Sequence, residues 1–119
     1  MTRVLVDTNI LILHIAAMPA FSFIPGSVAI SALSVFEALR YPGLSKDEEA
    51  LLLLLIRSCD VIPITEVIAD RAAKIARTKR GRVVDLLIAG TAIECGFPLV
   101  TRNTKDFKGI RGLELRSEV

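Results

Sequence analysis

Four acidic residues lie at or just beyond the ends of predicted strands, or at the rim of a predicted helix. Asp7 directly follows the apolar run Val4–Val6, which predicts a buried strand ending at an open sheet edge. Glu37 lies about one helical turn beyond a second such run, Asp85 opens a very apolar helix, and Asp106 lies in a polar segment after a late strand. Because open α/β sheets bind ligands at the carboxyl ends of their strands, these acids can converge.

Converging carboxylates are unstable by like-charge repulsion unless cations or shifted pKa values relieve them. Oxygen ligands suit Mg²⁺ or Mn²⁺, and no histidine or cysteine pattern in the chain suits zinc. One or two such ions, with carboxylates holding a water, form a standard arrangement for phosphodiester hydrolysis. The sequence therefore predicts a hydrolytic site in which the same four acids are the catalytic and the metal-binding residues.

Each acid also has a local structural explanation that stays open at this stage. Asp7 and Asp85 are both suited to cap the helix that follows them, since Asp is a favoured N-cap residue. Glu37 can pair with Arg40 on an exposed helix face. What favours a functional interpretation is that all four acids occur in similar settings at strand ends or helix rims.

Two basic segments flank the later acids. The helix predicted from residue 65 runs into a cluster of cations with no acid between them, and a second basic segment spans 102–108. Basic residues favour a helix C-terminus, and a solvated basic face is the plain alternative. Because the segments flank Asp85 and Asp106, we expect them to hold a phosphate backbone. The expected substrate-binding residues are Arg77, Lys79, Arg80, Arg82 and Arg102.

Short apolar runs alternate with longer helical patterns along the whole chain. The runs predict strands at 4–6, 27–30, 59–64, 97–100 and 113–115. Helices are predicted from 8 to 17, from 31 or 34 to about 41, from 45 to 58, from 65 onward, and from 86 to 95. This alternation implies a parallel sheet with right-handed crossovers, which places the strand ends at one edge.

Several residues mark where these helices begin, end and pack. Ser45 with Glu48 matches a capping box, Thr65 is placed to cap the next helix, and Gly96 ends the last one. Gly90, inside the apolar helix, allows close packing against a neighbouring element.

Composition limits the function classes. The chain has 119 residues, of which 52% are hydrophobic, so we expect a single compact domain over 1–119. A net charge of +2 is too small to diagnose a nucleic-acid binder by itself. The longest apolar run, Leu51–Ile56, is too short to span a membrane, and Cys59 and Cys95 are far apart, which is typical of reduced thiols. We expect a cytoplasmic protein with no membrane contact.

Four motifs then resemble a known family. They are Val-Asp-Thr-Asn at 6–9, Ser-x-x-x-x-x-Glu at 31–37, Asp-Leu-Leu-Ile-Ala-Gly-Thr-Ala at 85–92 and Val-Thr-Arg-Asn-Thr-Lys-Asp-Phe at 100–107. In this order they resemble the PIN-domain ribonucleases, above all the VapC-type toxins of prokaryotic toxin–antitoxin systems. The resemblance implies a three-layer α/β/α sandwich around a central, mostly parallel sheet of about five short strands. It also implies Mg²⁺- or Mn²⁺-dependent endoribonuclease activity, a homodimer and inhibition by a cognate antitoxin.

The resemblance also implies roles for particular residues. The positions that match the family's acidic site are Asp7, Glu37, Asp85 and Asp106. Asn103 matches a polar residue beside that site. Thr8 and Ser31 match supporting residues, and Thr8 is independently well placed to hydrogen-bond a carboxylate or a helix end.

Other enzyme classes fit less well. A dehalogenase-type phosphoryl transferase needs a second Asp at position 9, where the chain has Asn9. A response-regulator receiver needs an acidic pair before its first helix, and a Rossmann domain needs a Gly-rich turn after its first strand. The remaining alternative is a catalytically silent PIN-like module that binds RNA or a protein. We also expect the apolar segments 12–24 and 50–56 to contact a second copy or the antitoxin.

Overall fold

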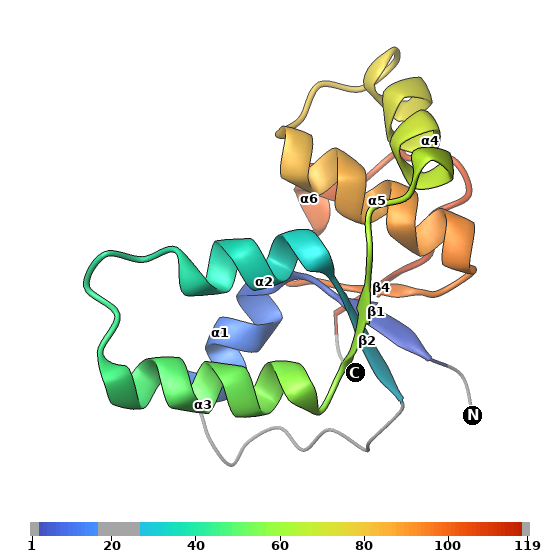
Figure 1. Ribbon diagram of the computed structural model, residues 1–119. Coiled ribbons are helices and arrows are strands. Elements are labelled where there is room, and N and C mark those ends of the chain that lie inside the picture. Colours follow the sequence, from blue (N-terminus) through green and yellow to red (C-terminus); the bar gives the residue numbers. More distant parts are fainter. Residues whose placement is uncertain (1–2, 17–26, 118–119) are drawn as a thin grey trace.

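The architecture is a parallel sheet whose central strand comes first in the chain. A computed structural model describes residues 3–16 and 27–117 (Figure 1). Its strands are β1 (Val4–Val6), β2 (Val28–Ser31), β3 (Asp60–Ile62), β4 (Leu99–Val100) and β5 (Leu115–Arg116). They form one sheet in the order β3-β2-β1-β4-β5, and every neighbouring pair is parallel. The predicted mostly parallel sheet of about five strands is confirmed.

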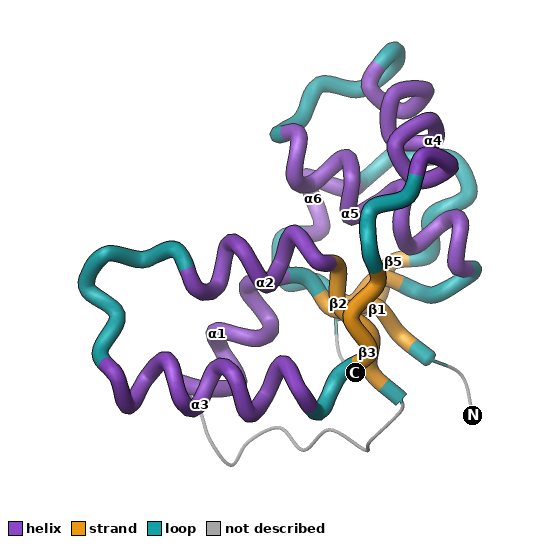
Figure 2. Tube along the Cα trace, in the orientation of Figure 1, coloured by secondary structure: helices purple, strands orange, loops and turns teal. Residues whose placement is uncertain are grey.

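Helices cover both faces of this sheet. They are α1 (Thr8–Ala16), α2 (Ala32–Leu39), α3 (Lys46–Arg57), α4 (Glu66–Ala76), α5 (Val83–Cys95) and the single turn α6 (Thr104–Phe107). In Figure 2, α4 and α5 lie on one side of the strands, and α1, α2 and α3 lie on the other. The predicted three-layer α/β/α arrangement is confirmed.

Alternation along β1 explains the two layers of core. Successive side chains of a strand point to opposite faces of the sheet. Leu5 packs in a cluster with residues of α4 and α5, whereas Val4 and Val6 pack in a second cluster with residues of α1 and α3. All three side chains are buried, as expected for the central strand of a sheet that is covered on both faces.

Local hydrogen bonds start the helices where the sequence predicts. The Ser45 hydroxyl accepts from the backbone N–H of Glu48, and the Glu48 side chain accepts from the backbone N–H of Ser45, which completes the capping box. The Thr65 hydroxyl accepts from the N–H of Ile68 and starts α4. Gly96 ends α5 with φ of 71°, in the left-handed region that favours glycine.

The start of α5 differs from the prediction. We expected the helix to span 86–95 with Asp85 as its N-cap, but it begins at Val83 and its N-cap residue is Arg82. The β-branched residues Val83 and Val84 have a low helix propensity; Val84 packs against the core, whereas Val83 is exposed. Asp85 is therefore the third helical residue, and its side chain is not used as a cap.

Other differences concern the ends of elements. The helix α4 ends at Ala76 with Arg77 as its C-cap, so the cations that follow lie in the connection to α5 rather than on the helix. The segment 104–107, expected as loop, forms α6, and the last strand is shifted to Leu115–Arg116. None of the helices within residues 3–16 and 27–117 is long and apolar enough to cross a membrane.

The crossing of α4 and α5 is unusually close at one point. A Cβ atom added at Gly90 would lie 3.1 Å from the carbonyl oxygen of Ile68 and 3.2 Å from the backbone nitrogen of Ala72. Both atoms belong to the backbone of α4 and cannot move aside as a flexible side chain would. The predicted role of Gly90 in close packing is confirmed.

Candidate active site

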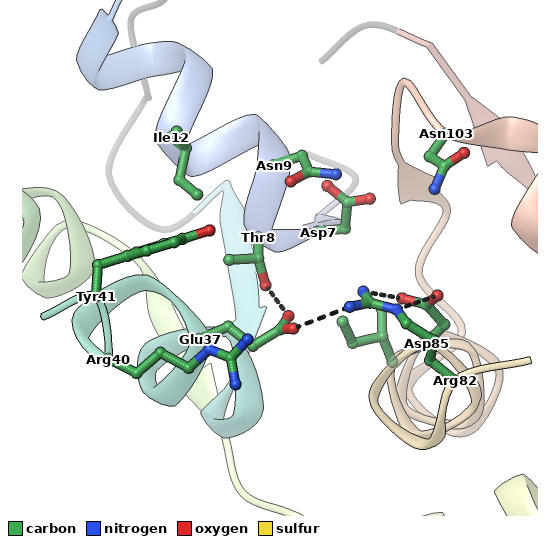
Figure 3. A pocket seen from close by; sticks show the side chains of 11 residues that line it. Asp7, Thr8, Asn9, Ile12, Glu37, Arg40, Tyr41, Arg82, Asp85 and Asn103 are labelled. Carbon is green, nitrogen blue, oxygen red and sulfur yellow. Dashed lines mark hydrogen bonds and ion pairs between the residues drawn. The ribbon is translucent and has the colours of Figure 1, made fainter.

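A small polar pocket lies at the carboxyl ends of β1 and β2, beside the N-terminus of α5 (Figure 3). Its volume is about 90 Å³. Three of the four predicted acids line it, each from a different part of the chain: Asp7 follows β1, Glu37 lies in α2 and Asp85 lies in α5. The parallel topology therefore brings together carboxylates that are up to 78 positions apart in the sequence.

Asp7 is held on both of its carboxylate oxygens. Its side chain caps α1, because Oδ1 accepts from the N–H of Ile10 at 3.2 Å, and Oδ2 accepts from the hydroxyl of Thr101. The residue is only 5% exposed. Burial raises the pKa of Asp7 above its ordinary value, while these hydrogen bonds act in the opposite direction and the negative charge of Asp85 adds to the rise. A cation in the pocket would relieve this unfavourable burial of charge.

Glu37 is oriented by a threonine from another helix. The hydroxyl of Thr8 donates to Oε1 of Glu37 at 2.8 Å and lies 3.0 Å from the hydroxyl of Ser34 (Figure 3). The hydrogen bond predicted between Thr8 and a carboxylate is confirmed. The alternative pairing of Glu37 with Arg40 is wrong, because Arg40 instead lies 6.0 Å from the centre of the Phe36 ring.

Arg82 bridges two of the acids. Its Nε and Nη2 atoms donate to Oδ2 and Oδ1 of Asp85 at 3.2 and 3.1 Å, which is a forked pair. Its Nη1 lies 3.7 Å from Oε2 of Glu37 (Figure 3). The hydrogen bonds and charge of Asp85 raise the pKa of Arg82, and Glu37 adds to the rise, so its guanidinium is fully charged.

Asp106 does not join the other three acids. It is exposed on α6 and accepts a hydrogen bond from the side-chain amide of Asn103, which does line the pocket. The prediction that all four carboxylates converge is therefore wrong for this one. The reason is the helical turn α6, which begins directly after Asn103 and places Asp106 outside the pocket lining. Its charge still lies near enough to raise the pKa of Arg82.

The predicted supporting residues occupy different places. Thr8 and Asn103 line the pocket. Ser31 does not line it, because its fully buried side chain caps α2 by accepting from the N–H of Leu33.

Thr101 belongs to the site although the sequence analysis did not select it. Its hydroxyl donates to Asp7 and accepts from the N–H of Asn103 at 3.0 Å, so one buried group joins both sides of the pocket. Its position in the sequence could have indicated this role, because Thr101 directly follows β4 as Asp7 directly follows β1. Asn9, which also lines the pocket, was missed as well.

The predicted substrate-binding cations fall into two groups. Arg82 lies in the pocket, held by its acids, whereas the other four are outside the pocket lining. Those four are Arg77, Lys79, Arg80 and Arg102, and within the described part of the chain none of them forms an ion pair. They are free to meet a ligand that extends beyond the pocket.

Comparison with known proteins identifies the family. The model of the PIN domain matches residues 4–113. The chain belongs to the PIN-domain family. It is also 31% identical to Ribonuclease VapC1 of Methanocaldococcus jannaschii, in an alignment that covers 97% of this PIN domain and 86% of that protein.

Solved structures agree with this assignment. A toxin–antitoxin complex from Klebsiella pneumoniae contains a chain that is 30% identical, with a TM-score of 0.78 and coverage of 98% of this chain and 99% of that one. The DNA-bound VapBC of Salmonella typhimurium has a chain that is 26% identical, with a TM-score of 0.78 and coverage of 98% of both chains. The PIN-like sandwich expected from the sequence is therefore confirmed.

The donors of this PIN domain suit a hard divalent cation. The carboxylates of Asp7, Glu37 and Asp85 and the side chain of Asn103 supply oxygen ligands around one cavity, which is the chemistry that Mg²⁺ and Mn²⁺ prefer. As they stand, no three Asp, Glu, His or Cys side chains in residues 3–16 and 27–117 are close enough to hold one ion together. The donor types fit a metal, and the guanidinium of Arg82 contacts the carboxylates of Glu37 and Asp85.

Proposed function

We propose that this PIN domain is a metal-dependent endoribonuclease that hydrolyses RNA phosphodiester bonds, and that it is the toxin of a toxin–antitoxin pair. The observation that carries the proposal is the meeting of Asp7, Glu37 and Asp85 in one pocket at the carboxyl ends of parallel strands. The ribonuclease named from M. jannaschii and the toxin–antitoxin complexes from K. pneumoniae and S. typhimurium support it.

The proposed roles follow from the contacts. Asp7, Glu37 and Asp85 would hold Mg²⁺ or Mn²⁺, with Thr101 and Thr8 fixing two of these carboxylates. When bound, such an ion supplies an activated water and stabilises the leaving oxygen. Asp106, proposed from the sequence as a fourth metal-binding and catalytic acid, would act from outside the pocket through Asn103, which it orients.

The distribution of charge supports an RNA substrate. Residues 66–117 contain eleven of the fifteen Lys and Arg residues but only six acidic residues, so the part of the chain that supplies Asp85 and Asn103 is strongly basic. Phosphate contacts from exposed cations supply most of the non-specific affinity of a protein for nucleic acid. Arg77, Lys79, Arg80 and Arg102 are proposed to hold the RNA backbone beside the pocket.

The decisive test is cleavage of a mixed RNA pool by the purified protein with Mg²⁺, with Mn²⁺ and with EDTA. We expect cleavage only with a metal, and a loss of at least 100-fold in Asp7→Asn and in Asp85→Asn, the order of effect seen when electrostatic groups of an active site are removed. Circular dichroism would show that both variants remain folded. Cleavage at the native rate by either variant would refute the assignment of its acid.

The second candidate is a catalytically silent module that binds RNA or a partner protein. One observation favours it: no three acidic side chains in the described ranges are positioned to share an ion. A folded protein that binds RNA, fails to bind Mn²⁺ and never cleaves would establish this candidate and exclude the nuclease.

Partner contacts are proposed for the face formed by α2 and α3, which contact one another. Phe36 and Tyr41 near α2, and Leu51 and Leu54 on α3, are exposed although they are large and apolar. We propose that this face binds the cognate antitoxin or a second copy. Of the predicted contact segment 50–56, Leu51 and Leu54 are exposed here, whereas Leu52, Leu55 and Ile56 are buried in the core; residues 17–24 of the other segment lie outside the described residues.

Light scattering of the protein alone, and after co-expression with the product of the neighbouring gene, tests this assignment. A monodisperse monomer under both conditions would count against it. We also propose a cytoplasmic location and a single PIN-like domain over 1–119, as the sequence predicts.

A further inference from the structure

We propose that Arg82 is a built-in competitor of the metal ion: its guanidinium occupies the acidic pocket in the metal-free protein and must leave before a divalent cation binds. This inference rests on the proposed function, because it assumes that Glu37 and Asp85 are metal ligands. It adds that metal loading is an exchange of one cation for another rather than the filling of a ready site.

The first support is the engagement of the carboxylate oxygens. Both oxygens of Asp85 accept hydrogen bonds from Arg82, at 3.2 and 3.1 Å. One oxygen of Glu37 accepts from Thr8, and the other lies 3.7 Å from Arg82. Arg82 therefore faces three of these four oxygen atoms, and an ion that bound both acids would have to displace it.

The second support is the burial of the two acids. The side chains of Glu37 and Asp85 are only 14% and 11% exposed, so water screens their charges weakly. Asp7, buried in the same pocket, and Asp106, outside it, add negative charge. Two cations line the pocket, Arg40 and Arg82, and of these Arg82 forms the ion pairs with Glu37 and Asp85, so it supplies compensating charge directly to the carboxylates.

The third support is that the Arg82 side chain can leave without moving the fold. It is 65% exposed, although its guanidinium reaches both acids. Its backbone is extended, with φ of −68° and ψ of 146°, and it makes no side-chain cap on α5. A rotation of the side chain alone would release it, while Asp85 stays fixed in the first turn of α5.

Geometry also explains why arginine suits this role. The planar guanidinium presents several donors in a fixed fork, so it can bind one carboxylate with two bonds and still face a second. A lysine ammonium is a compact point charge and cannot reproduce the fork. The competition should therefore depend on the shape of the side chain as well as on its charge.

The test is titration of Mn²⁺ into metal-free protein by calorimetry, without RNA, for the wild type, Arg82→Gln, Arg82→Lys and Arg80→Gln. Arg80 is the matched control: it is two residues away, exposed, and forms no ion pair within the described ranges. We expect the Mn²⁺ Kd of Arg82→Gln to fall by about three- to tenfold, because a competing state that is favoured several-fold no longer opposes binding. The Kd of Arg82→Lys should lie between those of the wild type and Arg82→Gln. Arg80→Gln should change the Kd less than about twofold, because it removes only a screened surface charge.

Thermal unfolding in EDTA provides a second readout. Without a metal, Arg82→Gln removes the ion pairs of Glu37 and Asp85 and leaves Arg40 as the remaining cation of the pocket lining, so its Tm should fall by a few degrees, whereas Arg80→Gln should not change it. Excess Mn²⁺ should return Arg82→Gln to the Tm of the metal-loaded wild type.

The outcomes separate the two proposals. If the wild type binds Mn²⁺ and Arg82→Gln binds it with the same or a weaker affinity, Arg82 is not a competitor, and the nuclease assignment is unaffected. An unchanged Tm of Arg82→Gln in EDTA would also overturn the inference. If the wild type does not bind Mn²⁺ at all, the proposed metal site fails and the inference fails with it.

Discussion

At the scale of single residues, hydroxyl groups set the positions of the charges in the pocket. Thr101 and Thr8 come from opposite ends of the chain and each fixes one carboxylate, Asp7 and Glu37 respectively. A buried threonine hydroxyl can donate one hydrogen bond and accept others, so it can orient an acid without adding charge to a crowded site. These two residues should therefore matter as much for the geometry of the site as the acids themselves.

Replacing Thr101 tests this expectation. Thr101→Val keeps the shape but removes the donor to Asp7 and the acceptor for the N–H of Asn103. Leaving buried polar groups unpaired should lower the free energy of unfolding by about 1–3 kcal/mol, measured by urea denaturation. Thr101→Ser keeps the hydroxyl, so its free energy of unfolding should fall by less than that of Thr101→Val. Equal stabilities of the two variants would show that the hydroxyl does not hold Asp7.

The burial of Asp7 predicts a pH-dependent stability in the absence of metal. Its pKa in the folded protein is raised, so between its ordinary pKa and the raised value the folded chain binds more protons than the unfolded chain. Stability is therefore lost as the pH rises through that window. Asp7→Asn removes this cost, and Asn still caps a helix well. In EDTA at pH 7 the variant should be more stable by about 0.5–2 kcal/mol, the usual size of a stabilising substitution.

Denaturation of Asp7→Asn and the wild type across pH 4 to 8 measures this difference. It should shrink as the pH falls towards the ordinary pKa of aspartate, about 3.9. A difference that stayed constant with pH would contradict the assigned cause. The same variant should be inactive throughout, so stability and activity should change in opposite directions.

The acids that sequence analysis placed correctly are those tied to strong elements. Asp7 follows a buried strand and Glu37 lies in a short helix that is capped directly after β2, so the parallel topology brings them together. Asp106 was misplaced because a single helical turn, α6, forms after Asn103, and so short an element has little local signal. The bridging position of Arg82 was not predictable either, since it depends on where α5 begins.

At the scale of elements, the start of α5 decides the form of the pocket. Because α5 begins at Val83, Asp85 stands in its first turn, where the helix dipole favours a negative charge, and its carboxylate is left for Arg82. Capping residues located the starts of α3 and α4 in the sequence, but the start of α5 carries no side-chain cap. A start that depends on tertiary packing cannot be found from local patterns.

The α4–α5 crossing gives a prediction at this scale. In an isolated helix, Gly90→Ala would stabilise by about 1 kcal/mol, because Ala is the better helix former. Here the new methyl group would press on the backbone of α4 at Ile68 and Ala72, and such overpacking costs about 1–3 kcal/mol. We therefore expect a net loss of stability in thermal or urea unfolding. Gly43→Ala, where a Cβ meets nothing within 4 Å, is the control and should change stability little.

A gain of stability in Gly90→Ala comparable to the helix-propensity gain would show that the two helices separate easily. That result would also imply that the N-terminus of α5, with Asp85 and Arg82, is not rigidly placed over the sheet.

At the scale of the whole molecule, charge is divided unequally along the chain. Residues 1–65 carry six acidic and four basic residues, whereas 66–117 carry six acidic and eleven basic ones. The small net charge of +2 therefore conceals a basic half, which is why total charge was a poor guide to an RNA-binding function.

The salt dependence of RNA binding measures how many cations of residues 66–117 contact the RNA phosphates. Binding of a single-stranded RNA in EDTA, where no cleavage is expected, should weaken steeply as salt rises. The double variant Lys79→Gln with Arg80→Gln should reduce the slope of log K against log salt by about 1.4, the value for two lost phosphate contacts on a single strand. Lys46→Gln with Arg57→Gln, an equal change of charge on α3, should leave the slope unchanged. Equal effects of the two pairs would show that the RNA does not follow the basic connection before α5.

The central position of β1 has a consequence for how the protein is made. Asp7 and Thr101 touch across adjacent strands but are 94 positions apart in the chain, which corresponds to about 5 to 19 s of synthesis at ordinary translation rates. During that interval β1 has an open edge on one side, and the acids already made lack the groups that orient Asp7 and line the far wall of the pocket. A chain still attached to the ribosome therefore carries the acidic residues without their final geometry. The pocket can therefore assemble only after β4 has been made and has paired with β1.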